Sequence, residues 1–338
     1  MLIEGSQVIA TEDITLNADQ NITLLAAGNT SEHSSQNKSS SASVGASFSG
    51  AGVAANVSAS RANGQADGES QSSTNTRVQA GGTLTLRSGG DTTLQGATAS
   101  GHKVTAAVGG HLTLSSLQDA SHYQDKSQSS GFSVSVPITG GAASASVSHS
   151  KTSIDSHYQS VGEQTAIRAG DGGFDIDVKG KTTLTGAQII STDKAVQGGK
   201  NSFKSAGGLD LQDLHNSAQF DASSYSVSAT VQGDSRNQDG TPKLDAAGQP
   251  VKGKPQGSAG FGSDSGQASS TSTAGISGVA GHTSARTGDE EAGLKPLFDA
   301  AKTKADVQGQ VAITAEFGKN ASKAWGDFAT NPKELRKN

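Results

Sequence analysis

The chain has 338 residues, of which 32% are hydrophobic and 4% aromatic, with 44 glycines, no cysteine and a formal net charge of −5. So few bulky side chains exclude a wide globular core, and the scattered acidic excess is a poor match for nucleic acid. The lack of cysteine excludes disulfides, thiolate nucleophiles and cysteine-ligated zinc, and no apolar run approaches the roughly 20 residues of a membrane-spanning helix.

From the N-terminus onward, short apolar–polar–apolar triplets recur between small turn residues. They lie at Ile14–Leu16, Ile22–Leu24, Leu84–Leu86, Leu112–Leu114 and Leu209–Leu211. Alternation with period two predicts strands, and strands this short hold together only when stacked as rungs on copies of themselves. The sequence therefore predicts an all-β chain built on a right-handed parallel β-helix, or solenoid. Its core would contain Leu84, Leu86, Leu94, Leu112, Leu114, Leu209 and Leu211.

Serine-rich segments lead from these rungs into blocks of strict alternation, each broken by glycines. The first block spans residues 41–60 around Gly50–Gly52, the second spans residues 131–150 around Gly140 and Gly141, and a third begins at Tyr225. Each block predicts a β-hairpin excursion with a glycine turn and strands of about eight residues. The apolar residues expected to characterise these hairpins are Val44, Phe48, Val53, Val57, Phe132, Val134, Val136, Val147, Tyr225 and Val227.

Similar segments leave the first two hairpins about 90 residues apart, at Thr76–Gly82 and Thr165–Gly173. The repeat region should therefore span residues 1–287, in units of about 1–73, 74–163 and 164–287, with a polar, proline-containing exposed loop at 233–257. Residues 288–338 differ, because Leu294, Leu297, Phe298 and Ala301 follow helical spacing, as do Val307, Val311 and Ala315. They predict a helical segment, interpreted as a pair of helices that also contains Trp325 and Phe328.

Several stretches together resemble filamentous hemagglutinin-type exoproteins of two-partner secretion, including the effectors of contact-dependent growth inhibition. The stretches are LTLRSGGDTTLQGATASG, SHYQDKSQSSGFSVSV and the segment that begins GLKPLFDAAKTKADVQGQVAITAEFGKNASKAWGDFA. The hemagglutinin-repeat resemblance covers roughly residues 10–285, and the helical segment resembles what precedes a variable toxin region. The chain departs from the full pattern in lacking a secretion domain, a signal peptide and a recognisable toxin motif.

The resemblance implies a protein secreted or held at the bacterial surface as part of a longer exoprotein, exported by an outer-membrane partner transporter. It implies a non-enzymatic repeat segment that presents or translocates a C-terminal effector to a neighbouring or host cell. The target would be that cell's surface or outer membrane, and an immunity protein would accompany a downstream toxin. A structural adhesin stalk in biofilm or host attachment and a carbohydrate-active β-helix enzyme are the alternatives.

The sequence predicts no catalytic residue, no cofactor and no metal site. The best local cluster is Asp210, Asp213 and His215, which we interpret as solvated turn residues rather than an acid–base or metal site. One Gly-Asp stretch, Ala169–Asp177, is a single copy of a pattern that binds calcium only when stacked. Two His-Tyr pairs, at His122 and His157, could act as a pH-sensitive latch, although packing of the rings on the solenoid is favoured.

The hairpins offer another hypothesis, because their strands alternate serine with valine, alanine or phenylalanine. Membrane strands alternate in this way, and about 9–11 residues cross a bilayer. Pairing of the hairpins edge to edge in a target membrane is therefore a possible mode of action. The alternative is that they lie on the solenoid or pair with one another in water.

Overall fold

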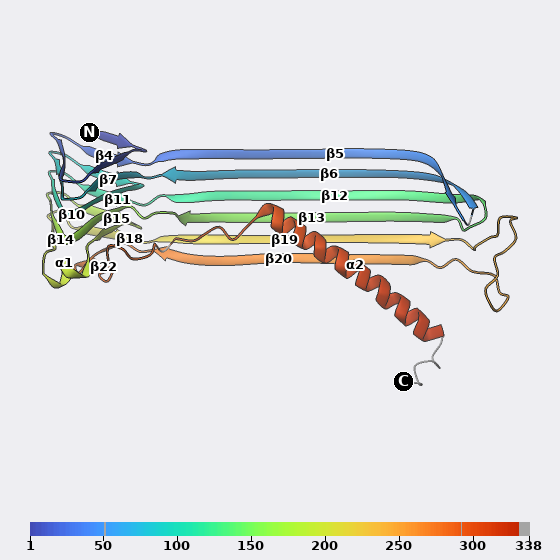
Figure 1. The fold of residues 1–338 in the computed structure, drawn as a ribbon. Coiled ribbons are helices and arrows are strands. Elements are labelled where there is room, and N and C mark those ends of the chain that lie inside the picture. Colours follow the sequence, from blue (N-terminus) through green and yellow to red (C-terminus); the bar gives the residue numbers. More distant parts are fainter. Residues whose placement is uncertain (51, 292, 331–338) are drawn as a thin grey trace.

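The computed structural model describes the backbone of residues 1–50, 52–291 and 293–330, and side chains as far as residue 320. Figure 1 shows two parts: a body of short stacked strands that contains the N-terminus, and a long sheet that extends from it and is crossed by the C-terminal helix. Nearly all regular structure is β, so the expected all-β class with a short helical C-terminal segment is confirmed.

Two parallel sheets build the stacked body. One has the order β1 (Leu2–Glu4), β4 (Ile22–Leu25), β9 (Thr92–Gln95), β11 (Leu112–Ser115), β15 (Thr182–Thr185), β18 (Leu209–Gln212). The other has the order β2 (Gln7–Ala10), β7 (Thr76–Ala80), β10 (Ala97–Val108), β14 (Ala166–Val178), β16 (Gln188–Ile190), β21 (Gly275–Ile276), β22 (Ala280–Gly281). Three strands pair alongside it: β3 (Ile14–Ala18), β8 (Thr83–Ser88) and β17 (Ser202–Ser205). Every pairing in the two sheets is parallel except β21 with β22. Stacked parallel rungs are what the sequence predicts, while the right-handed coil stays a prediction.

A column of leucines runs through the stack and explains the spacing of the triplets. Leu24, Leu94, Leu114, Leu184 and Leu211 pair in register from strand to strand. Leu94 and Leu114, on successive rungs, are 20 residues apart in the sequence. Leu24 and Leu94, and likewise Leu114 and Leu184, are 70 residues apart, because a long hairpin is inserted between them. Leu84, Leu86, Leu94, Leu112 and Leu114 are fully buried, whereas Leu209 and Leu211 are only partly buried.

Glycine corners allow the rungs to stack closely. The Gly109 N–H donates to Ser88 O at 2.9 Å, and a Cβ added at Gly109 would lie 2.2 Å from Gly89 O. No side chain fits there without moving the backbone, so the recurring Gly-Gly pairs are a steric requirement of the stack.

Three long hairpins pair edge to edge into one antiparallel sheet. Its order is β20 (Gln256–Ser272), β19 (Leu214–Gln232), β13 (Ser144–Val161), β12 (Gln118–Thr139), β6 (Gly52–Thr74), β5 (Ala27–Ser49). The turns fall at the expected glycines, but the expectation of eight-residue strands is wrong, because β5 and β6 have 23 residues each. The serine-rich segments are part of the strands, since the backbone ladder of a neighbouring hairpin stabilises them without an apolar core. Residues 233–255, which join β19 to β20, are mostly exposed.

The helices are α1 (Asp193–Gln197) and α2 (Ala300–Thr330). The expected pair of C-terminal helices is wrong within the described residues: α2 is one 31-residue helix, and Leu294, Leu297 and Phe298 precede it in non-helical chain. Phe298 packs on the sheet instead, since its ring centroid lies 5.3 Å from that of Tyr123 and 5.7 Å from that of Phe220, whereas Leu297 is exposed. Trp325 and Phe328 fall in the part of α2 whose side chains lie outside the described set.

Candidate functional site

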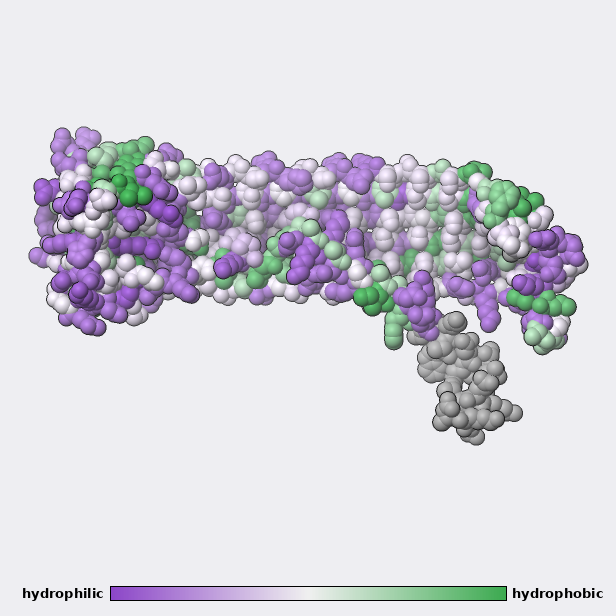
Figure 2. Space-filling view, viewed as in Figure 1, coloured by the Kyte–Doolittle hydropathy of each residue, from purple (hydrophilic) through white to green (hydrophobic). Residues whose placement is uncertain are grey.

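The long sheet has two different faces. The helix face carries Tyr123, Asp125, Ile154 and Phe220, which lie under α2 and the segment before it. The open face carries the alternate residues, which point away from α2 because successive side chains of a strand point to opposite sides. Figure 2 views the helix face, which is mostly pale to purple along the strands and becomes green at the turn end of the sheet.

Near the turns, the open face becomes apolar. One row across the sheet consists of Val44, Val57, Val134, Ala145 and Val231, which pair in register over five strands. The next row toward the body consists of Ala42, Ala59, Phe132, Val147 and Ala229. Phe48 pairs with Val53 between the first row and the turn at the end of β5. We call the apolar residues of these rows the tip patch.

The tip patch is exposed rather than packed. Val44 is 83% exposed, Phe48 79% and Val231 62%, and Val57, Phe132 and Val147 are exposed as well. Val136 and Val227, in rows next to the patch, are also exposed. Val53, Val134 and Tyr225 are half-buried. Contiguous exposed apolar side chains are rare on monomeric soluble proteins and mark a surface that contacts another apolar surface.

Hydroxyl groups line the helix face behind the tip patch. Ser43 and Ser58 lie 2.7 Å apart between their Oγ atoms, Ser133 and Ser146 2.5 Å, and Ser228 and Ser258 2.7 Å. These pairs link neighbouring strands of each hairpin. The tip of the sheet is therefore amphipathic, with an apolar open face and a hydroxyl-lined helix face.

The length of this amphipathic zone is comparable to a bilayer. The run from Ala42 to Ser49 would span about 24 Å at the usual rise of a strand, against about 30 Å for the hydrocarbon core of a membrane. Among the helices of the described chain, none is long and apolar enough to cross a membrane.

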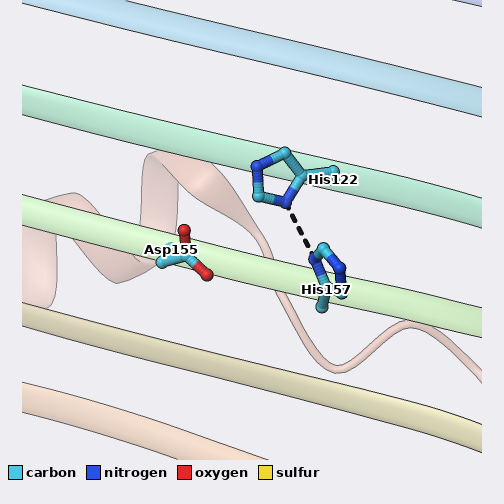
Figure 3. Close-up of side chains that lie close together, drawn as sticks. All are labelled: His122, Asp155 and His157. Carbon is cyan, nitrogen blue, oxygen red and sulfur yellow. Dashed lines mark hydrogen bonds between the residues drawn. The ribbon is translucent and has the colours of Figure 1, made fainter.

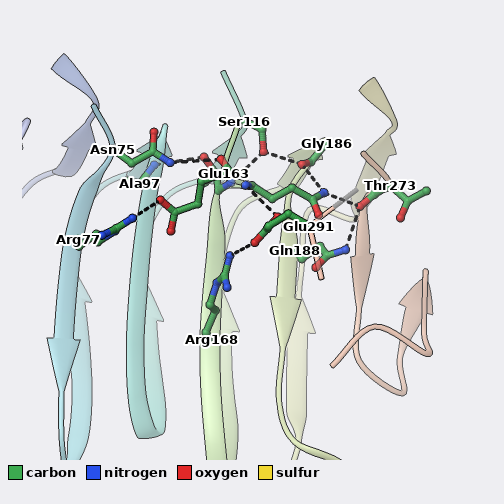
Figure 4. A network of polar contacts seen from close by, with 12 residues as sticks. Asn75, Arg77, Ala97, Ser116, Glu163, Arg168, Gly186, Gln188, Thr273 and Glu291 are labelled. Atoms are coloured by element: carbon green, nitrogen blue, oxygen red, sulfur yellow. Dashed lines mark hydrogen bonds and ion pairs between the residues drawn. The ribbon is translucent and has the colours of Figure 1, made fainter. Parts of the chain in front are cut away.

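The necks of the first two hairpins are held by a polar network (Figure 4). Thr76 Oγ1 donates to Leu25 O at 2.6 Å, and Thr165 Oγ1 donates to Ser115 O at 2.8 Å. The chain that returns from each hairpin is thus tied to the end of the short strand, β4 or β11, that precedes the hairpin. Arg77 forms an ion pair with Glu163 at 2.8 Å between Nη2 and Oε2. The hairpins are thereby anchored in a fixed direction relative to the body.

A second part of this network attaches the segment before α2 to the body. Arg168 forms an ion pair with Glu291, and Glu291 Oε2 accepts a hydrogen bond from the Gln164 N–H at 3.1 Å. The Gln164 side chain donates to Gly186 O and Thr273 O. Sequence inspection gave no signal for these contacts, because those that reach Thr273 and Glu291 join residues more than a hundred positions apart.

The helix α2 covers one edge of the long sheet. At the outer strand β20, the Phe261 N–H donates to Thr314 Oγ1 at 2.8 Å, and the Ser263 N–H donates to Gln310 Oε1 at 3.0 Å. Gly260 and Gly262 permit this approach, since an added Cβ would lie 2.2 Å from Val311 O and 2.1 Å from Val307 O. Free strand edges template aggregation, and the helix blocks this one.

The candidate cluster Asp210, Asp213 and His215 does not converge on a site. Asp210 pairs with Lys181 at 2.9 Å, Asp213 Oδ1 accepts from the Ala274 N–H, and His215 Nδ1 lies 3.2 Å from Thr271 Oγ1. The hydrogen bond from Lys181 and its charge hold the pKa of Asp210 below its usual value.

The Gly-Asp stretch likewise makes ordinary surface contacts. Asp171 accepts hydrogen bonds from Lys194 and from Thr192, which lower its pKa, and Asp177 pairs with Lys179. A calcium site would need several carboxylates of this stretch to face one point, whereas Asp171 and Asp177 are each paired with a lysine of their own.

The two His-Tyr pairs are brought together across hairpin β12–β13, where His122 pairs with His157 in register. Their imidazoles meet on the open face, with Nδ1 atoms 2.8 Å apart and Asp155 beside them (Figure 3). The tyrosines point to the helix face. The favoured interpretation, that the rings pack on the stacked body, is wrong: Tyr123 packs on Phe298, and the Tyr158 hydroxyl donates to Leu294 O at 2.7 Å. Burial raises the pKa of both phenols.

Comparison with known proteins identifies the class of repeat. Residues 1–130 match the family model described as hemagglutinin repeat. Over 234 residues, or 68% of this chain, the sequence is 36% identical to a protein of Escherichia coli named Toxin CdiA, and this stretch is 7% of that protein. The Deoxyribonuclease CdiA of Yersinia pseudotuberculosis is 36% identical over 65% of this chain and 20% of its own length.

A tRNA nuclease CdiA of Yersinia mollaretii is 34% identical over 67% of this chain and 8% of its own length. Residues 1–130 thus carry a hemagglutinin repeat, and the resemblance to filamentous hemagglutinin-type exoproteins is confirmed. The chain spans less than a quarter of the length of each of these relatives. No solved structure matches the chain.

Proposed function

We propose that this chain is a non-enzymatic repeat segment of a secreted toxin-delivery exoprotein, and that its tip patch contacts the lipid of a target cell's outer membrane. The observation that carries the proposal is the exposed apolar open face of three aligned hairpins, backed by paired hydroxyls. A surface with this distribution of side chains lowers its free energy by burying the apolar face in lipid while the serines remain hydrated.

The relatives support the delivery part of the proposal, because they are named as a toxin and as nucleases while the shared stretch is a small share of each. Such an activity would reside outside the shared stretch. The longer exoprotein would use an outer-membrane partner transporter for export and be accompanied by an immunity protein, as the resemblance implies. The repeat would then place the sheet at the target surface and present or translocate the effector.

The two edges of the long sheet also support a place within a longer array. The edge at β20 is covered by α2, whereas β5 is the terminal strand on the other side. A further unit of the same construction would add its rungs on β1 and β2 and its hairpin on β5, since these lie at the same end of their sheets.

The proposal is tested with the purified chain and liposomes of outer-membrane-like composition, by flotation and dye release. The triple substitution Val44→Ser, Phe48→Ser and Phe132→Ser should abolish co-flotation. The matched control, Leu244→Ser with Val279→Ser, removes exposed apolar side chains outside the tip patch and should float like the wild type. Wild-type protein that neither floats nor releases dye would refute lipid contact, and retained binding to whole cells in that case would favour an adhesin stalk.

A further inference from the structure

We propose that His122, His157 and Asp155 form a binding site for a divalent transition-metal cation of the zinc class on the open face, near the base of the second hairpin. One ligand atom from each of these side chains lies within 4.8 Å of the others. Figure 3 shows the two imidazoles facing each other across neighbouring strands, with the carboxylate on the same side of the sheet. Two imidazoles and a carboxylate are a common donor set for zinc.

The geometry of the histidine pair requires only a small adjustment to hold an ion. The Nδ1 atoms are 2.8 Å apart, and two nitrogens on one tetrahedral zinc are roughly 3.3–3.4 Å apart. Ser156 O also lies 3.2 Å from His122 Nδ1. Because a carbonyl oxygen can only accept a hydrogen bond, we place the proton on His122 Nδ1, which then donates to both Ser156 O and His157 Nδ1. His157 Nδ1 therefore presents a lone pair, and His122 becomes a ligand when its proton moves to Nε2.

The surrounding charges supply an independent reason for a cation. On the open face, Glu69 is the cross-strand partner of His122, and Glu32 is the partner of Glu69. One row nearer the tip, Asp155 faces Asp221. Like charges directly opposite each other destabilise a sheet. None of these four carboxylates has an ion-pair partner among the described residues, and a divalent cation would relieve both repulsions.

The site is also accessible. A shallow depression of about 280 Å³ over β5, β6, β12 and β13 of the long sheet is lined by both histidines, Glu32 and Glu69. An ion could enter from solvent and recruit the Glu69 carboxylate or water as its fourth ligand. Bound metal would join β12 to β13 on the face opposite to the tyrosines that hold the segment before α2.

The test is a calorimetric titration of the metal-stripped full chain with Zn²⁺, together with Co²⁺ absorption spectra that report tetrahedral coordination. We expect one ion per chain, and His122→Gln or His157→Gln should weaken binding by about tenfold or more, as losses around a metal site generally do. His149→Gln is the matched control, because His149 lies on the same face and strand but pairs with Ser130 and Tyr225. It should bind as the wild type does.

The proposal is overturned if Zn²⁺ does not saturate a site, if both histidine variants keep the wild-type affinity, or if the control loses as much as they do. Imidazole proton resonances of the wild-type chain give a reading that needs no variant. Zn²⁺ should shift those of His122 and His157 alone, and a shift spread over all eight histidines would mean non-specific binding.

Discussion

Lys304→Met should release the start of α2 from the long sheet. Lys304 Nζ lies 2.6 Å from Asp125 Oδ2, and the Asp125 side chain is only 3% exposed while that of Lys304 is 39% exposed. Removing the lysine leaves a buried carboxylate without a counter-charge. Such a loss costs about 3–5 kcal/mol for fully buried pairs, and the exposure of Lys304 reduces this to about 1–3 kcal/mol.

The effect should be local, so it is best measured by hydrogen exchange of the α2 amides together with urea unfolding followed by circular dichroism. The α2 amides should exchange faster by a factor that corresponds to the lost free energy. The matched control is Lys319→Met on the same helix. Lys319 Nζ lies 3.5 Å from Glu316 Oε2, and both side chains are exposed. Removing this ion pair should change the free energy of unfolding by less than about 0.5 kcal/mol.

The double variant Lys304→Met with Asp125→Asn completes the test, because it removes both charges. It should recover part of the loss, since no carboxylate is then left unpaired. Equal exchange of the α2 amides in the wild type and in Lys304→Met would show that the pair does not hold the helix, and the reasoning would fail.

Three further predictions concern other parts of the chain. Gly262→Ala should displace α2 from β20 and lower the stability of the folded chain by about 1–3 kcal/mol. Gly257→Ala is the control, because its added Cβ would lie 3.4 Å from the nearest atom and should leave α2 in place. Hydrogen exchange of the α2 amides should be faster in the first variant only, and equal rates in both would contradict the prediction. Leu114→Ala should lower the free energy of unfolding by about 2–5 kcal/mol, because Leu114 is buried in the leucine column. The neighbouring substitution Thr113→Ala should lower it by less than about 0.5 kcal/mol. Equal urea midpoints for the two variants would contradict the stacked core. Lys181→Met should raise the pKa of Asp210 toward its ordinary value in an NMR titration. Because the folded pKa is the lower one, the Lys181–Asp210 pair stabilises the fold above the unfolded pKa of about 4, and this stabilisation is lost as the pH falls through the folded value.

How much of the candidate site the sequence can predict is clear from the two histidines. If the two strands are paired symmetrically about the predicted turn at Gly140 and Gly141, His122 falls within two residues of its true partner, His157. That accuracy is insufficient, because a shift of one residue would move a ring to the other face of the sheet. The apolar residues of the tip patch follow from alternation in the same way, but which face α2 would cover does not.

The chain sequence by itself determined the elements whose stability is local or repetitive. Triplets such as Leu84–Leu86 fixed the stacked strands, glycine pairs fixed the turns, and the helical spacing of Val307, Val311 and Ala315 located α2 but not its start. Only the tertiary structure decided the length of the hairpins, their common sheet, and the docking of α2 through Thr314 and Lys304. The physical reason is that serine- and glycine-rich strands have little side-chain preference for one partner, so backbone pairing with a neighbouring hairpin and close contact at Gly260 and Gly262 settle the arrangement.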